Sequence, residues 1–328
     1  MNSLFLPFAF TLSWLFCASM ISSDALAQTG EATNTKPANE EVLAAATPFI
    51  VAGYIPDYQL AHWSGDVGSL TDLIYFGASV SEEGRFVPAP LSREHAQLLQ
   101  KAKGETRRRL LFTVGGWNKS DGFATLAADS RLRAQFIDEA KAYCQKHGFD
   151  GIDYDWEHPK GKQQVDAYTQ LLKETYDAFK HHKLIVTVAI AGWQDLGKDA
   201  FAAVDRVHLM SYDHEFPHAT MDKAKADITR LLKAGCPASK IVLGIPFYGR
   251  NKDGHTKSFA QLTKGRILAH NEDIVDGYAM NGPVTVAEKV RFARETKLAG
   301  VMIWELGQDA SMESSLLRSV EAEANAGR

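Results

Sequence analysis

The chain of 328 residues has little of what defines several protein classes. It has three cysteines and neither a C-x-x-C nor an H-E-x-x-H motif, which excludes a disulfide-dense scaffold and the common zinc sites. Neither G-x-G-x-x-G nor a P-loop occurs, which disfavours an open doubly wound sheet with a phosphate loop. The formal net charge is only −4, so neither nucleic acid nor an anionic membrane surface is an expected partner.

Long apolar runs are also scarce, and the clearest one lies at the N-terminus. Residues 1–27 contain an apolar, aromatic run and end in Ala25-x-Ala27, the small-residue pattern of a signal-peptide cleavage site. The alternative is an uncleaved membrane anchor, which would need about 20 apolar residues. The run is shorter and interrupted by polar residues, so we expect cleavage after Ala27 and a secreted or periplasmic (cell-envelope) protein. Residues 28–47 lack apolar periodicity and are expected to form a flexible lead-in.

Beyond this lead-in, short apolar runs alternate with longer amphipathic stretches. Near-continuous apolar runs are typical of parallel strands that are buried on both faces. Eight runs fit this description: 49–58, 72–80, 109–117, 149–157, 183–192, 206–213, 240–250 and 300–309. Five stretches between them have apolar residues at helical spacing: 92–105, 129–148, 162–182, 219–235 and 285–300. The pattern predicts an α/β fold, a single (β/α)8 TIM barrel over residues 48–328.

The segment Asp150-Gly-Ile-Asp153-Tyr-Asp155-Trp-Glu157 carries the sharpest chemical signal. Alternate side chains of a strand share a face, so Asp153, Asp155 and Glu157 should point together into the barrel. A buried cluster of like charges is costly, so at least one carboxyl should hold a proton near neutral pH, as a general acid requires. Solvated or helix-capping acids and a metal site are the alternatives. Asp150 is out of phase, and we expect it to be structural, tied to hydroxyl or backbone groups near Thr113.

These acids resemble the D-x-x-D-x-D-x-E signature of glycoside hydrolase family 18, the family of chitinases and endo-β-N-acetylglucosaminidases, and every position matches. Other strand ends also resemble family motifs: Thr113-Val-Gly115-Gly116 on the third strand, Met210-Ser-Tyr212-Asp213 on the sixth, and Trp304 on the eighth. Thr113 replaces the family's serine but keeps a hydroxyl.

The resemblance implies a retaining, substrate-assisted hydrolysis of β-1,4 bonds next to N-acetylglucosamine. Glu157 would protonate the glycosidic oxygen, and the substrate's own acetamido carbonyl would attack the anomeric carbon. Asp155 would orient the acetamido group and stabilise the resulting oxazolinium ion, with Asp153 sharing its proton. Tyr212 would donate a hydrogen bond to the acetamido oxygen, and Trp304 would form the apolar floor of the sugar site.

Further residues are predicted to line the sugar-binding groove or to hold the groove residues in place. We expect Asp213 to contact the sugar and Arg250 to pair with an acid at the rim. The remaining groove candidates are Met210, Tyr54, Phe76, Gly116, Trp117 and Trp193, and the supporting residues are Asp150, Thr113 and Gly115.

The resemblance implies a class of substrates but does not single out one substrate. Chitin or chito-oligosaccharide comes first, and an N-glycan or peptidoglycan would suit the same chemistry. A non-catalytic glycan-binding protein and a metal-dependent deacetylase are the alternatives from other classes. No cofactor, metal or obligate protein partner is implied, and a monomer is expected.

Only about 35 residues lie between Arg250 and Thr285, too few for the α+β insertion that many family members carry there. The short segment predicts an open cleft suited to endo-type or non-processive cutting.

Overall fold

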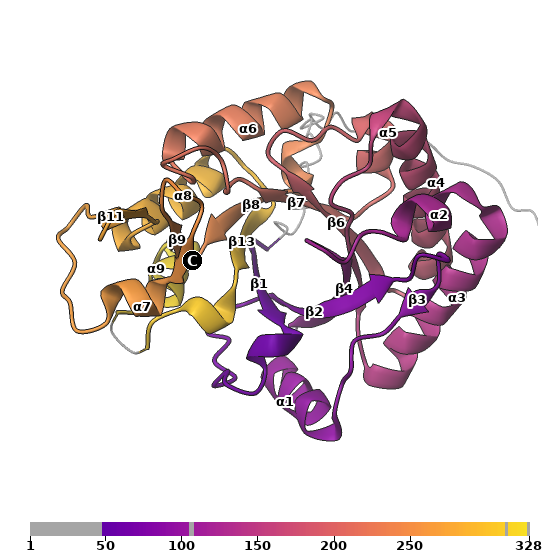
Figure 1. Cartoon of the computed structure of the whole chain (residues 1–328), viewed down its shortest axis with the longest axis horizontal. Helices are drawn as coiled ribbons and strands as arrows, with labels where there is room; N and C mark the ends of the chain where they lie inside the picture. The colour runs from indigo at the N-terminus through magenta and orange to yellow at the C-terminus, as the bar shows by residue number, and fades with distance from the viewer. Residues whose placement is uncertain (1–47, 105–107, 312–313, 327–328) are drawn as a thin grey trace, which may run out of the picture. The chain divides into compact units, whose positions relative to one another are not determined.

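A closed ring of eight parallel strands forms the centre of the fold (Figure 1). The computed structural model describes residues 48–104, 108–311 and 314–326, so the expected signal peptide and lead-in lie outside the described residues. The ring closes because β1 pairs with both β2 and β13. Its strands are β1 (Ile50–Pro56), β2 (Asp72–Val80), β4 (Arg109–Gly115), β5 (Gly151–Asp155), β6 (Ile185–Ala191), β7 (Arg206–Met210), β8 (Ile241–Pro246) and β13 (Gly300–Trp304). The predicted (β/α)8 barrel is confirmed.

Helices surround the ring and cover its outer face (Figure 1). They are α1 (Arg93–Lys103), α2 (Phe123–Ala128), α3 (Ser130–His147), α4 (Gly161–Lys180), α5 (Gly197–Ala202), α6 (Met221–Lys233), α8 (Pro283–Glu295) and α9 (Leu316–Asn325). The five helices predicted from periodicity correspond to α1, α3, α4, α6 and α8. In the part of the chain that the structure describes, no helix has the length and apolar character needed to cross a membrane.

Local sequence signals set several helix ends. The side chain of Ser92 accepts a hydrogen bond from His95 N at the start of α1. The side chain of Asp129 accepts hydrogen bonds from two backbone N–H groups at the start of α3. Gly148 ends α3 in the left-handed conformation, with a φ of +71°.

Replacing Gly148 by alanine is expected to lower the free energy of unfolding by about 1–2 kcal/mol, because a Cβ disfavours the left-handed conformation. The added Cβ would approach only the flexible side chain of Gln100, at 3.0 Å, so the loss of stability comes from the backbone conformation and not from a steric clash. Urea unfolding followed by circular dichroism measures it. The exposed Gln145→Ala on the last turn of α3 is the control, expected within about 0.5 kcal/mol of the parent. An equally small effect of Gly148→Ala would contradict the argument.

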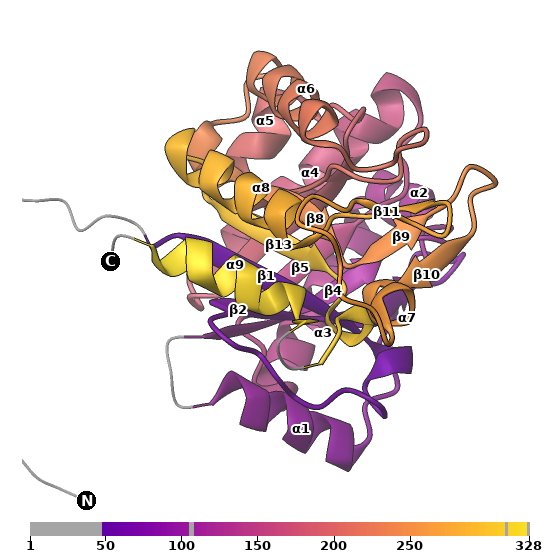
Figure 2. The ribbon, with the colours of Figure 1, turned by 90° about the vertical axis from the view of Figure 1, so that its left-hand side faces the viewer.

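A small antiparallel sheet follows β8, and the sequence patterns did not predict it. Its strand order is β10 (Thr256–Ser258), β9 (Tyr248–Arg250), β12 (Tyr278–Ala279) and β11 (Ile274–Val275), and α7 (Phe259–Thr263) follows β10. Figure 2 shows this sheet and α7 gathered at one end of the barrel. Because β9 begins two residues after β8 ends, that end is the one at which the barrel strands terminate. A short hairpin strand, β3 (Phe86–Val87), also pairs with β2.

The opposite end of the barrel is occupied by ion pairs. Asp72, at the start of β2, is fully buried and contacts the guanidinium of Arg206 at the start of β7. Arg109 Nη1 lies 3.5 Å from the same carboxyl. Salt bridges therefore occupy the N-terminal end of the ring, whereas the C-terminal end carries the acids described next.

Candidate active site

Asp153 lies at the bottom of the site, fully buried inside the barrel. Its Oδ2 accepts hydrogen bonds from Tyr54 Oη at 2.9 Å and Thr113 Oγ1 at 3.1 Å, and its Oδ1 accepts one from Thr187 Oγ1 at 2.5 Å. His208 Nδ1 lies 3.3 Å from Oδ1. Thr113 and Thr187 are the register neighbours of Asp153 on the two adjacent strands, which places their hydroxyls beside it.

Asp155, two residues further along β5, is only 4% exposed. Burial raises its pKa well above the usual range, and the nearby charges of Glu157 and Asp153 raise it further. Its Oδ1 has no hydrogen-bond partner among the described residues. A buried carboxyl oxygen without a partner is rare in proteins, so Asp155 presents an acceptor that a ligand's donor could satisfy.

Glu157 follows the end of β5. Its backbone is positioned by Ser120, a residue that the sequence patterns did not predict to be part of the site. Its backbone N–H donates to Ser120 Oγ at 2.9 Å. Burial and the charge of Asp213 raise the pKa of Glu157 to about 7, although a backbone hydrogen bond from Trp117 acts in the opposite direction. His158 Nε2 lies 3.6 Å from Glu157 Oε2. Glu157 is therefore protonated over the acidic range in which a general acid must act.

Two glycines at the end of β4 allow the backbone to approach this cluster. Gly115 and Gly116 have φ values of +101° and +104°, which side-chain-bearing residues rarely adopt. A Cβ on Gly115 would lie 2.2 Å from the carbonyl oxygen of Asp155, and one on Gly116 would lie 2.3 Å from the ring of Phe76. Both predicted positions therefore require glycine.

Tyr212 follows β7, which is separated from β5 by one strand, β6. Burial raises the pKa of its phenol well above the usual value, and the charges of Asp213, Asp155 and Glu157 add to that effect. Its hydroxyl lies 3.9 Å from Met302 Sδ. The phenol therefore keeps its proton and remains a hydrogen-bond donor. Met210, the last residue of β7, is partly buried against an apolar cluster that includes Tyr212, Tyr54 and Phe76.

Asp213 lies at the rim beside Arg250, whose Nη1 is 3.4 Å from Asp213 Oδ1. Partial burial acts to raise the pKa of Asp213. Interactions with the neighbouring His218 and Tyr248 side chains and with the positive charge of Arg250 outweigh it and lower the pKa below the usual value. The carboxylate is therefore ionised, and its negative charge raises the pKa of Glu157.

The aromatic candidates separate into buried and exposed groups. The ring of Trp304 lies 5.0 Å from Phe76 and 5.5 Å from Tyr54, measured between centroids. Tyr54 and Phe76 are 2% and 5% exposed, so they lie beneath Trp304 instead of forming the groove surface predicted for them. Trp117 and Trp193 are 72% and 66% exposed and remain available to a ligand.

Asp150 lies apart from the other acids, as its phase in the strand predicts. Its Oδ2 accepts a hydrogen bond from Leu110 N at 2.8 Å and lies 2.6 Å from Lys103 Nζ. The predicted backbone bond exists, but it is made near the start of β4, and the Thr113 hydroxyl serves Asp153 instead.

A further acid, Glu305, follows Trp304 at the C-terminal end of β13, where the sequence places a polar residue but assigns it no role. It is fully buried, and it accepts hydrogen bonds from Gln59 Nε2 at 3.0 Å and Gly307 N at 2.7 Å. Burial raises its pKa to about 7. These contacts fix the turn that follows Trp304. Within the described ranges, no cluster of three or more His, Cys, Asp or Glu side chains is arranged to hold a metal ion.

The chain resembles known proteins along most of its length. The family model for glycosyl hydrolases family 18 matches residues 51–309. Probable chitinase 2 of Drosophila melanogaster is 28% identical over 61% of this chain and 56% of its own length. Chitinase 1 of Aphanocladium album is 25% identical over 67% of this chain and 66% of its own length. The chain thus spans under two thirds of the length of these two curated relatives.

Solved structures share the fold. A chitinase from Bacteroides thetaiotaomicron is 24% identical and superposes with a TM-score of 0.78, covering 85% of this chain and 97% of that chain. A plant class V chitinase mutant from Cycas revoluta, in complex with (GlcNAc)3, is 23% identical with a TM-score of 0.74, covering 84% of this chain and 99% of that chain. The family match spans well over half of the sequence, and the chain belongs to glycosyl hydrolases family 18.

Proposed function

We propose that this chain is a secreted, retaining glycoside hydrolase that cleaves β-1,4 bonds next to N-acetylglucosamine. The observation that carries the proposal is the pairing of two acids in different environments. Glu157 has a pKa of about 7, and Asp155 presents a buried carboxyl oxygen without a partner. The names of the relatives, which are chitinases, support chitin or its oligosaccharides as the substrate.

Asp155 serves the substrate's acetamido group. The acetamido N–H is a donor that would satisfy Asp155 Oδ1, and this bond would aim the acetamido carbonyl oxygen at the anomeric carbon. The carbonyl then forms a bond to that carbon as the glycosidic bond breaks, which gives a positively charged oxazolinium ion. The Asp155 carboxylate stabilises this charge, with its proton shared toward Asp153.

Glu157 supplies the proton for the departing glycosidic oxygen. Once ionised, it accepts a proton from the incoming water, which attacks the anomeric carbon and reopens the oxazolinium ring. Two displacements on the same carbon give retention of configuration. Tyr212 donates to the acetamido oxygen, Trp304 supports the apolar face of the sugar, and Asp213 contacts the sugar from the rim.

The rate constant kcat/KM is expected to fall as pH rises through about 7, because Glu157 loses the proton that it must donate. The charge of Asp213 contributes to this raised pKa, so Asp213→Asn should move the alkaline limb of the profile to lower pH. Initial rates on a chromogenic chitobioside from pH 4 to 9 measure both. The exposed Asp253→Asn, also near the rim, is the control, and an alkaline limb that is the same in both variants would refute the assignment.

Product analysis on chitin, chito-oligosaccharides and a high-mannose glycoprotein tests the substrate. The proposal expects cleavage within chitin chains and release of the β-anomer, as seen by proton NMR immediately after addition of enzyme. Cleavage of the glycoprotein alone would favour an endo-β-N-acetylglucosaminidase. Absence of sugar release at every pH from 4 to 8 would favour a binding protein, and loss of activity with a chelator would favour a deacetylase.

A further inference from the structure

The loop of residues 211–220 joins β7 to α6 and carries two of the proposed site residues, Tyr212 and Asp213. Asp213 has a φ of +59°, in the left-handed region that residues with a side chain seldom occupy. Such a conformation persists only where neighbouring contacts hold it. The contacts that flank it are therefore part of how the site is built.

One carboxylate oxygen holds the loop on both sides of this residue pair. Asp227 on α6 is 9% exposed, and its Oδ2 accepts a hydrogen bond from Ser211 Oγ at 2.7 Å. The same oxygen lies 2.9 Å from His214 Nε2. Ser211 and His214 immediately precede and follow Tyr212–Asp213, so Asp227 binds both ends of this dipeptide.

The contact of the second ring nitrogen, Nδ1, shows which protonation state of His214 is compatible with both ring contacts. His214 Nδ1 lies 2.9 Å from the backbone oxygen of His218. A carbonyl oxygen can only accept, so Nδ1 carries a proton. The Asp227 carboxylate also accepts, so Nε2 must carry a proton as well. His214 satisfies both contacts only as the imidazolium ion.

We propose that His214 is a positioning residue whose protonated form, bound to Asp227, holds Tyr212 and Asp213 in the geometry of the site. Loss of one proton would leave one ring nitrogen without a hydrogen, either Nε2 facing the Asp227 carboxylate or Nδ1 facing the His218 carbonyl, so the loop would lose one of the two ring contacts of His214. The role of this contact in catalysis rests on the proposed function, but the contact between His214 and Asp227 does not.

The surroundings of His214 favour its charged form. The hydrogen bond with Asp227 raises the pKa of His214, and this effect outweighs burial and the charge of Lys223. Because the pKa is raised, the contact is complete below the ordinary histidine value and is lost as pH rises through the higher value of the folded protein. The other charged or titratable groups around the adjoining cavity of about 200 Å³ are Glu215, His218, Arg250, Lys252 and Asp253.

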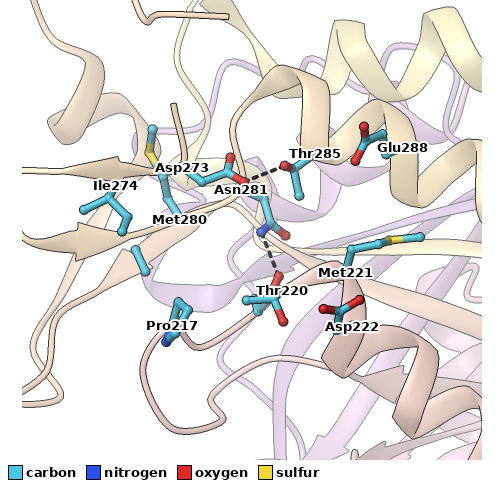
Figure 3. Close-up of a pocket in the computed structure, with 12 residues that line it drawn as sticks. Pro217, Thr220, Met221, Asp222, Asp273, Ile274, Met280, Asn281, Thr285 and Glu288 are labelled. Atoms are coloured by element: carbon cyan, nitrogen blue, oxygen red, sulfur yellow. Dashed lines mark hydrogen bonds between the residues drawn. The ribbon is translucent and has the colours of Figure 1, made fainter. Parts of the chain in front are cut away.

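The far end of the loop is held separately. The backbone oxygen of Ala219 accepts hydrogen bonds from Lys289 Nζ and Asn281 Nδ2, both at 2.9 Å, beside a cavity of about 360 Å³ (Figure 3). Lys289 Nζ also donates to Asn281 Oδ1 at 2.8 Å. Burial lowers the pKa of Lys289 to about 7, but a neutral amine keeps two N–H groups, enough for both acceptors. Deprotonation of His214 therefore weakens only the end next to the site, where the hydrogen bond from Ser211 to Asp227 remains.

NMR of the isotopically labelled full chain tests the inference without a substrate. The His214 ring, identified by the loss of its signals in His214→Gln, should titrate above 6.5, its ordinary pKa. The amide signals of Tyr212 and Asp213 should shift with the same midpoint. A His214 midpoint at or below 6.5, or amides that do not follow it, would overturn the proposal.

Variants on α6 separate the named contact from general charge effects. Asp227→Asn should lower the His214 midpoint by at least about one pH unit, because a neutral amide no longer stabilises the cation. The exposed Asp222→Asn on the same helix is the matched control and should leave the midpoint in place. Equal shifts in the two variants would contradict a specific contact.

A kinetic comparison then tests the link to the site. His214→Leu removes both ring contacts and should lower kcat/KM on the chitobioside at least tenfold at pH 5, whereas His214→Gln keeps a donor toward Asp227 and should lose less. Equal losses in the two variants would refute the positioning role. If the parent hydrolyses no substrate, the proposed function fails, while the NMR titration still decides whether the attachment exists.

Discussion

Glu157→Gln is expected to lower kcat on a chromogenic chitobioside by about 10²–10⁴-fold, the usual contribution of a general acid. Glutamine has nearly the same shape but has no proton to give, so binding of chito-oligosaccharides should persist. Initial-rate kinetics and isothermal titration calorimetry measure the two effects. The exposed Glu295→Gln at the end of α8 is the control and should match the parent in both. Unchanged turnover in Glu157→Gln would exclude Glu157 as the acid.

The same substitution should stabilise the protein at alkaline pH. The folded-state pKa of Glu157 is about 7, above the ordinary glutamate value, so the folded state binds more protons than the unfolded state between the two values. Stability contributed by the protonated form is lost as pH rises through that window. Glutamine does not ionise, so at pH 8 the variant should unfold at a higher temperature than the parent. A lower melting temperature would instead indicate that the carboxylate holds the local structure.

The strand alternation explains why the central acids could be predicted from the sequence. A period of two fixes which side of a strand each residue faces, so Asp153, Asp155 and Glu157 were placed together without any knowledge of the neighbouring strands. The hydrogen-bond partners of these acids could not be predicted from this alternation alone. The hydroxyls on Asp153 come from Thr113 and Thr187, and this pairing depends on strand register, which the apolar runs did not specify.

Segments outside the barrel strands were predicted less well because short-range patterns do not determine them. The strands of the small sheet after β8 have only two or three residues each, too few to show a periodic pattern. Ser120 and His214 contact their partners across loops, and loop conformation depends on tertiary contacts. The signal peptide and the open cleft remain predictions.

Asp155→Asn is expected to lower kcat/KM by about 10²–10³-fold, the usual effect of removing one electrostatic contact to a charged transition state. The asparagine side-chain oxygen can still accept the acetamido N–H, so the substrate can be oriented, but the charge that stabilises the oxazolinium ion in the proposed mechanism is gone. Asp155→Ala removes both contributions and should lose more. Kinetics on the chitobioside measure the loss, and the exposed Asp138→Asn on α3 is the control.

Stability should change in the opposite direction, and this separates catalysis from folding. Asp155 is buried, its Oδ1 lacks a partner among the described residues, and its pKa is raised by burial and by two neighbouring acids. An ionised carboxyl in this position is costly to the folded state, so Asp155→Asn should unfold at the same temperature as the parent or higher. A loss of activity accompanied by a lower melting temperature would mean that Asp155 supports the fold. A loss of activity with equal or greater stability means that the protein keeps an unfavourable buried acid because the reaction needs its charge.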